Sequence, residues 1–278
     1  MALGLAKILE LPPIESHYEF TKRDTILYAL GVGANELKYT YEESLEALPT
    51  MAMVMGYPGF IWRDPRYGVD WKRVLHGESS LRVHRKLPVE GHLFGITRLG
   101  PIFDKGSGKG AVCYWTREVY DDAGMHLATV GAAIVLRGDG GFGGSSEGQP
   151  RPPILPERPP DLEHSLGTLP TQALTYRLSG DLNPIHVDPE IAIGAGFPRP
   201  ILHGLCTYAI AARSILISLC ANEPSQLRQI NARFTSPVFP GETIRTLIWQ
   251  DGSHRAFFRS LAEERGTVVL DNGVAEFG

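Results

Sequence analysis

A Gly/Pro-rich segment near the middle of the chain constrains the fold more than any other feature. Residues 138–160 read GDGGFGGSSEGQPRPPILPERPP, and 12 of these 23 residues are Gly or Pro. Proline lacks a backbone donor and glycine is a poor helix and strand former, so no regular element can run through this segment. The 278-residue chain therefore divides into a first half, residues 1–137, a linker, residues 138–160, and a second half, residues 161–278.

The two halves share faint sequence similarity at nearly one offset. One set of identities has an offset of 148 positions: Tyr28, Leu30 and Asn35 match Tyr176, Leu178 and Asn183. Further along, Leu87–Gly91 is similar to Ser236–Gly241, with an offset of 150 positions at the glycines. Two matches in the same order favour an ancient duplication, because repeats keep a fixed period.

Hydrophobic periodicity predicts an α+β unit in each half. In the second half, apolar residues from Leu205 to Leu219 recur with the spacing of one buried helix face. Strand-like runs separated by turn signals follow this helix, and the first half offers similar runs. The expected strands cover residues 79–85, 92–103, 111–120, 126–136, 230–235, 243–250, 256–262 and 267–275.

Composition excludes several classes of protein. The 27 basic and 31 acidic residues give a formal net charge of -4, which argues against binding to nucleic acid. Three cysteines without a CxxC pair favour a reducing compartment, and no apolar stretch approaches a membrane span. The N-terminus is a poor secretory signal and the C-terminus is not a Ser-Lys-Leu signal. We expect a cytoplasmic protein, or a peroxisomal one if the source is eukaryotic.

Two familiar motifs fail in their context. Gly138–Gly143 fits the GxGxxG pattern of dinucleotide-binding loops, and Gly144–Gly148 fits the GxSxG pattern of serine hydrolases. Both patterns require a helix to follow, and the sequence continues with Ser, Gly and Pro instead. Neither motif therefore indicates a site.

The densest polar cluster is Ser-Gly-Asp-Leu-Asn-Pro-Ile-His, residues 179–186. Asp181 and Asn183 could simply bond the backbone of a turn, with His186 incidental. The alternative is proton transfer, because Gly204 opens the long helix and its free N–H could polarise a carbonyl. A carboxylate, an amide, an imidazole and an oxyanion donor together favour catalysis.

These runs resemble the R-specific enoyl-CoA hydratase 2 family, the MaoC-like hydratases. The resemblance rests on the 179–186 run, on Pro200–Thr207 and on Arg233–Glu242, while Leu30–Ala34, Leu75–Glu78 and Asp104–Gly108 resemble the hydratase part of the peroxisomal multifunctional enzyme type 2. It implies a double hot-dog fold, in which each half is a long helix wrapped by an antiparallel sheet. It also implies syn hydration of trans-2-enoyl-CoA to the (3R)-3-hydroxyacyl-CoA in β-oxidation or related acyl-CoA metabolism, without a cofactor or metal.

The offset of 148 confines catalysis to the second half. It places Gly33 opposite Asp181 and Lys38 opposite His186, so the first half lacks both groups that could exchange a proton. By the resemblance, the first half completes the acyl-CoA cleft and the protein is a homodimer. The substrate-binding positions that the resemblance implies are His76, Gly77, Lys105, Phe234 and Glu42.

Three alternatives stay open at this point. A hot-dog thioesterase would use a carboxylate to direct water at the carbonyl carbon instead of C3. Asp181, His186 and His203 could form a two-histidine, one-carboxylate metal site. A hot-dog protein that only binds acyl-CoA would need no paired Asp and His.

Overall fold

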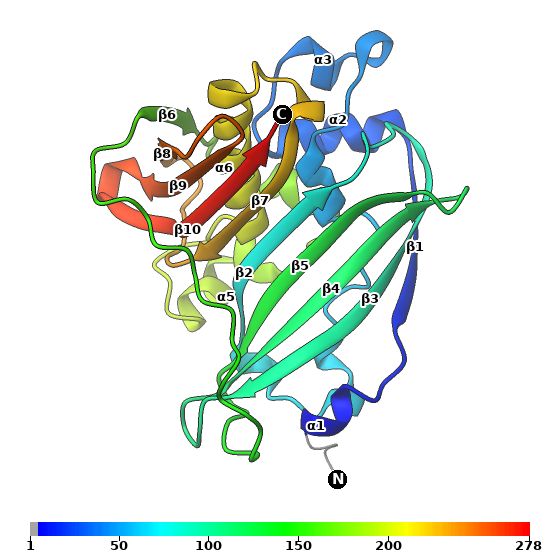
Figure 1. The fold of residues 1–278 in the computed structure, drawn as a ribbon, viewed down its shortest axis with the longest axis vertical. Helices are drawn as coiled ribbons and strands as arrows, with labels where there is room; N and C mark the ends of the chain where they lie inside the picture. Colours follow the sequence, from blue (N-terminus) through cyan, green and yellow to red (C-terminus); the bar gives the residue numbers. More distant parts are fainter. Residues whose placement is uncertain (1–4) are drawn as a thin grey trace.

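The computed structural model describes residues 5–278 and contains one continuous antiparallel sheet of ten strands (Figure 1). Residues 1–4, which begin the predicted first half, lie outside this part. The strand order is β1-β3-β4-β5-β2-β7-β10-β9-β8-β6. The bounds are β1 Ile14–Phe20, β2 Val74–Val83, β3 Gly91–Asp104, β4 Ala111–Asp121, β5 His126–Leu136, β6 Leu162–Gly167, β7 Leu227–Phe234, β8 Thr243–Gln250, β9 Arg255–Ala262 and β10 Thr267–Phe277.

The sheet has the symmetry that a duplication requires. Exchanging β1–β5 with β6–β10 reverses the strand order and leaves it otherwise unchanged. The halves join through the antiparallel pair of β2 and β7, in which Leu81 lies opposite Ile230. The first strands of the two halves begin at Ile14 and Leu162, again 148 positions apart.

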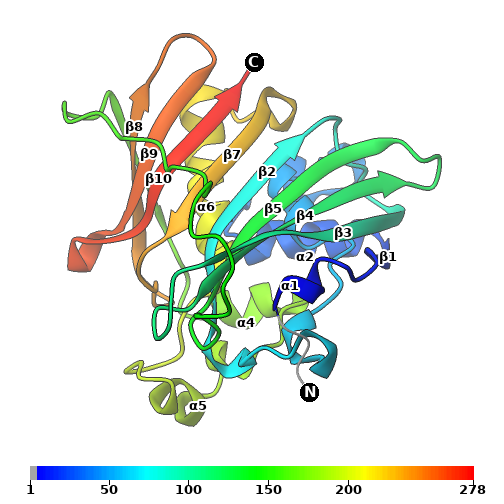
Figure 2. The ribbon, with the colours of Figure 1, turned by 60° about the horizontal axis from the view of Figure 1, so that its bottom comes forward.

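One long helix, α6 (Gly204–Leu219), packs against the face of the sheet opposite the linker (Figures 1 and 2). Its apolar stripe is buried, including Tyr208, Ala212 and Ile215. Both halves contribute to the core around it, and the rings of Tyr28 and Tyr176 meet with centroids 6.0 Å apart. The other helices are α1 Leu5–Ile8, α2 Lys22–Gly31, α3 Leu37–Thr40, α4 Gln172–Tyr176 and α5 Pro189–Gly194.

The expectation of a long helix in each half is correct only for the second half. The offset of 148 places the counterpart of α6 at residues 56–71, where the structure contains only short 3-10 turns. This segment includes two prolines and three glycines, and such residues interrupt a helical hydrogen-bond ladder. The helix α2 of the first half is ten residues long.

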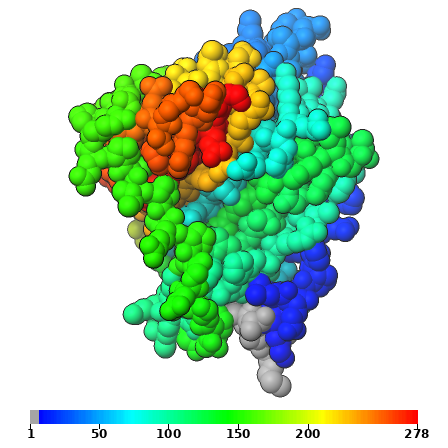
Figure 3. All heavy atoms as spheres, in the orientation of Figure 1, coloured from blue at the N-terminus to red at the C-terminus, as the bar shows by residue number. Residues whose placement is uncertain are grey.

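The start of the linker is fastened to the hairpin between β3 and β4. The Asp104 carboxylate accepts N–H bonds from Gly106, Gly141 and Gly143 at 2.8, 2.7 and 2.8 Å. A Cβ atom on Gly140 would lie 2.3 Å from the Gly106 carbonyl oxygen, so this close approach requires glycine. The GxGxxG pattern thus serves a loop contact, and the linker then crosses the open face of the sheet (Figure 3).

Among the helices of residues 5–278, none has the length and apolar character needed to cross a membrane.

Candidate active site

The loop that carries Asp181 and Asn183 is an Asx turn that leaves one carboxylate oxygen available. The Asn183 N–H donates to Asp181 Oδ1 at 3.1 Å, and Asn183 Oδ1 accepts the Ile185 N–H at 3.2 Å. The second contact caps the 3-10 turn η7 (Pro184–His186). Both side chains therefore bond the backbone, as one of our two interpretations held, while Asp181 Oδ2 stays directed toward His186.

The buried His186 presents a defined nitrogen to Asp181. Its Nδ1 lies 2.9 Å from the Ile201 carbonyl oxygen, which can only accept, so Nδ1 carries the proton. Nε2 then has its lone pair free, 3.9 Å from Asp181 Oδ2. Burial lowers the pKa of His186 below the ordinary histidine value, so the ring is neutral and can accept a proton.

His203 contacts both His186 and the backbone of Asp181. Its ring stacks on that of His186, with centroids 3.6 Å apart, and its Nε2 donates to the Asp181 backbone carbonyl at 3.1 Å. The contact supports the backbone of the loop that carries Asp181. Asp181, His186 and His203 offer ligand atoms within 4.8 Å of one another, and the N–H that each imidazole donates to a carbonyl leaves its other ring nitrogen free.

Gly204 places an open backbone donor beside the pair. It is the first residue of α6 and it is exposed, and no side chain caps this helix. The first N–H groups of a helix have no partner within the helix, and they carry the positive end of its dipole. A Cβ atom on Gly204 would lie 3.3 Å from the Phe234 ring, so this ring lies close to one side of the position.

Residues of β2 extend the site across the junction of the halves. The rings of His76 and Phe234 meet edge to face with centroids 5.1 Å apart. Gly77 forms a bulge in the pairing of β2 with β5, where a Cβ atom would lie 3.0 Å from Val135 Cγ2. The bulge and the ring contact bring the first half to the helix start of the second.

Tyr57 is a site residue that the sequence analysis missed. Partial burial and then the negative charge of Asp181 raise the pKa of Tyr57 to about 12. The offset of 148 offered a signal, because it puts Tyr57 opposite Leu205, directly after Gly204.

Two predicted substrate-binding residues have other partners in the described structure. Lys105 lies in the hairpin after β3, and its ammonium group contacts Gln149 of the linker. Glu42 lies in the exposed 3-10 turn η1 (Glu42–Ser44), and its backbone carbonyl accepts from Lys22 at 3.5 Å. Within the part of the chain that the structure describes, no hydrogen bond or ion pair joins either side chain to Asp181 or His186.

A symmetric ten-stranded sheet around one helix, with an imidazole and a carboxylate at the helix start, defines a double hot-dog protein of the MaoC-like class. Comparisons with known proteins agree. Residues 153–272 match the MaoC-like domain family, and residues 18–138 match the family of the MFE-2 hydratase 2 N-terminal domain. The chain belongs to the enoyl-CoA hydratase 2 family of MaoC-like proteins.

Its relatives include 3-hydroxyacyl-thioester dehydratase Y of Mycobacterium tuberculosis, which is 42% identical, with 94% of this chain and 93% of the relative covered. The probable enoyl-CoA hydratase 2 of Dictyostelium discoideum is 38% identical, with 99% and 97% covered. Among solved structures, a MaoC-like dehydratase from Phytophthora capsici superposes with a TM-score of 0.91 at 35% identity, with 99% of each chain covered.

Proposed function

We propose that this protein catalyses the reversible hydration of trans-2-enoyl-CoA to (3R)-3-hydroxyacyl-CoA. The observation that carries the proposal is the pair of proton acceptors, His186 Nε2 and Asp181 Oδ2, 3.9 Å apart beside the first residue of α6. Relatives named as hydratases and as dehydratases support both directions of one reaction.

The helix start activates the substrate. With the thioester carbonyl oxygen at the Gly204 N–H, the amide and the helix dipole stabilise the negative charge that develops on this oxygen. One such donor contributes roughly 3 kcal/mol to transition-state stabilisation. Because the carbonyl is conjugated to the double bond, its polarisation makes C3 electrophilic.

His186 and Asp181 then activate one water molecule. The water donates one hydrogen bond to His186 Nε2 and one to Asp181 Oδ2, and its oxygen adds to C3. One water proton passes to the pair, while the C2–C3 π electrons move toward the thioester and form an enolate. The enolate takes a proton from the same pair at C2, which restores both groups and gives syn addition.

The first half completes the cleft without taking part in proton transfer. We propose the division into residues 1–137, the linker 138–160 and the catalytic half 161–278, with His76 and Gly77 reaching the site from β2. The sequence offset supports the absence of proton transfer in the first half, because Gly33 and Lys38 stand there at the positions of Asp181 and His186. Lys105 and Glu42 stay proposed contacts for the acyl-CoA; in this structure Lys105 contacts Gln149, and the Glu42 carbonyl accepts from Lys22.

A substrate series tests the proposal. Enoyl-CoA of C4 to C16 should lose its conjugated thioester absorbance on incubation with the protein, and chiral analysis should find the (3R) product. Release of free CoA would instead identify a thioesterase, and loss of activity with a strong chelator would indicate the metal alternative. Binding of enoyl-CoA without turnover would leave only a binding protein.

We further propose a homodimer in a reducing compartment, the cytosol or the peroxisome. The sheet ends in the edge strands β1 and β6, and association of copies commonly covers exposed edges. Cys113, Cys206 and Cys220 are free and buried, which fits a reducing environment. Sedimentation equilibrium should give twice the chain mass of 30.5 kDa, and a monomer at micromolar concentration would contradict the dimer.

A further inference from the structure

A second cluster of metal-ligating side chains lies where β5 runs between β4 and β2. His84 directly follows β2, Glu118 lies on β4 and His126 opens β5. Each offers a ligand atom within 4.8 Å of the other two. Eight residues of extended chain separate His84 from His76, a span of roughly 26 Å at 3.3 Å per residue. The cluster is therefore distinct from the candidate active site.

The three ligand atoms converge on the hydroxyl group of Thr129. His84 Nε2 lies 2.9 Å and His126 Nε2 lies 3.3 Å from Thr129 Oγ1, which donates to Glu118 Oε2 at 2.7 Å. His126 Nε2 also lies in direct contact with Glu118 Oε2. The two imidazole rings lie against each other with centroids 4.2 Å apart. All three groups thus already point into one small volume.

The chemistry of this set selects a borderline transition metal. Two imidazoles and one carboxylate suit zinc, whereas magnesium and calcium prefer oxygen ligands alone. Zinc binds such ligands at about 2.0–2.1 Å in a tetrahedron, so its ligand atoms lie about 3.3 Å apart. The His84 side chain is exposed and the other two are partly exposed, so the site requires them to rotate into that spacing.

We propose that His84, Glu118 and His126 bind one zinc ion, with a water molecule in the fourth position. Thr129 holds the Glu118 carboxylate as a supporting hydrogen-bond donor, a role that orients ligands at many metal sites. The ion links the end of β2 to β4 and β5. Because only the folded chain brings the three ligands together, zinc binding stabilises the fold by mass action.

The test uses the untagged full-length chain after dialysis against a chelator. Titration with Co²⁺ should give the visible absorption of a tetrahedral site at one ion per chain, and calorimetry should give the same stoichiometry with Zn²⁺. His84→Ala and His126→Ala should abolish this binding, and Thr129→Val should weaken it about 10–100-fold. Zn²⁺ should raise the melting temperature of the wild type and not of these alanine variants.

Two controls decide the location of the ion. His92→Ala removes a histidine that pairs with Asp122 in the same sheet, at 2.5 Å, and it should leave binding intact. His186→Ala should also leave binding intact, because His186 belongs to the other cluster. The proposal is overturned by the absence of a tetrahedral Co²⁺ spectrum, by binding that survives His84→Ala and His126→Ala, or by binding that His186→Ala removes.

Discussion

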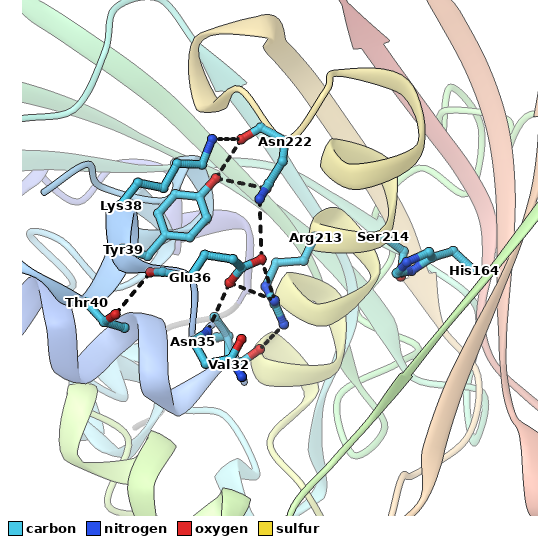
Figure 4. Close-up of polar contacts among 10 residues, drawn as sticks. All are labelled: Val32, Asn35, Glu36, Lys38, Tyr39, Thr40, His164, Arg213, Ser214 and Asn222. Carbon is cyan, nitrogen blue, oxygen red and sulfur yellow. Dashed lines mark hydrogen bonds and ion pairs between the residues drawn. The ribbon is translucent and has the colours of Figure 1, made fainter. Parts of the chain in front are cut away.

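The candidate active site and its counterpart in the first half show how one duplicated framework came to serve two purposes. At the active site, Asp181 and His186 lie next to the N-terminal end of α6. The counterpart, residues 33–39, lies against the C-terminal end of the same helix, where Lys38 and Tyr39 contact Asn222 (Figure 4). One helix thus presents its positive end to one region and its negative end to the other.

The counterpart is filled with fixed ion pairs and hydrogen bonds. The buried Arg213 guanidinium donates to the Val32 carbonyl at 3.2 Å and to Glu36 Oε1 at 3.2 Å (Figure 4). Lys38 pairs with Glu223 at 3.1 Å, and its ammonium group also contacts the Asn222 carbonyl, a suitable arrangement for a cation at a helix C-terminus. Every cation there has an acceptor.

The difference teaches that, in the proposed mechanism, catalysis depends on the N-terminal end of α6 as much as on the acid and base. The offset of 148 puts Gly56 at the position of Gly204, but Gly56 has φ +58° and no α-helix begins there. The counterpart therefore lacks an oxyanion donor in addition to the missing Asp and His. A carbonyl-lined helix end would repel the enolate oxygen.

Removing the acid-base pair gives the largest expected effect. Asp181→Asn and His186→Ala should each lower kcat at least about 100-fold with little change in KM, because such groups act in the transition state. Steady-state hydration rates measure this. Lys38→Met at the counterpart position is the matched control and should keep kcat, and near wild-type turnover in either site variant would contradict the mechanism.

Transplanting the pair tests the role of the helix end. Gly33→Asp and Lys38→His, added to a chain that carries Asp181→Asn and His186→Ala, should restore no hydration. Gly33 has φ +74°, which strains a side chain, and the region faces carbonyls at the end of α6. Single-turnover assays on the folded four-fold variant check this, and recovery of activity would show that the helix end is dispensable.

Removing an ion pair of the counterpart region should lower the stability of the fold and leave catalysis unchanged. Glu36→Gln removes the carboxylate that faces Arg213, whose side chain is only 6% exposed. The Val32 carbonyl and the glutamine oxygen can still accept from Arg213, so the loss of the Glu36 charge should cost about 1–3 kcal/mol of unfolding free energy. Urea denaturation measures it against Glu19→Gln, an exposed strand residue. An equal loss of kcat would contradict the separation of the two regions.

Mild acid should destabilise the active-site region first. Burial lowers the pKa of both His186 and His203. In the unfolded chain these rings protonate near pH 6.5, so unfolding takes up protons below that value. The free energy of unfolding is therefore independent of these two histidines above pH 6.5, and it decreases as the pH falls below that value. Denaturation midpoints from pH 7.5 to 5 check this, and His203→Gln should flatten the decline.

The neutral state of the His186 ring also determines the expected pH dependence of turnover. Because His186 accepts a proton through Nε2, kcat/KM should stay constant from neutral pH to below 6.5 and fall only under the lowered pKa of this ring. A decline that begins above pH 6.5 would indicate a different base.

Most of the sheet could be predicted from sequence, because eight of its strands are apolar runs between turn signals. The two edge strands could not. Residues 14–20 read IESHYEF and residues 162–167 read LEHSLG, and polar side chains dominate both because an edge strand buries little. Their identical offset of 148 was the available signal.

The candidate site was predictable where chemistry and turn geometry coincide. The run from Asp181 to His186 gave the pair, and the buried periodicity of α6 gave the helix start at Gly204. The sequence offered two roles for Asn183 and could not decide that its oxygen caps η7, and it gave no sign that the charge of Asp181 acts on Tyr57 of the other half. Contacts across the junction depend on tertiary packing, which no local pattern encodes.

The pairing of β2 with β7 has a consequence for synthesis of the chain. Leu81 and Ile230 are hydrogen-bonding neighbours in the sheet but 149 positions apart in sequence. A ribosome adds about 5–20 residues per second, so the β2 edge waits roughly 7–30 s for its partner. Throughout that interval an unpaired strand is exposed to other nascent chains, and the charged Glu78 and Arg82 along it guard against mispairing.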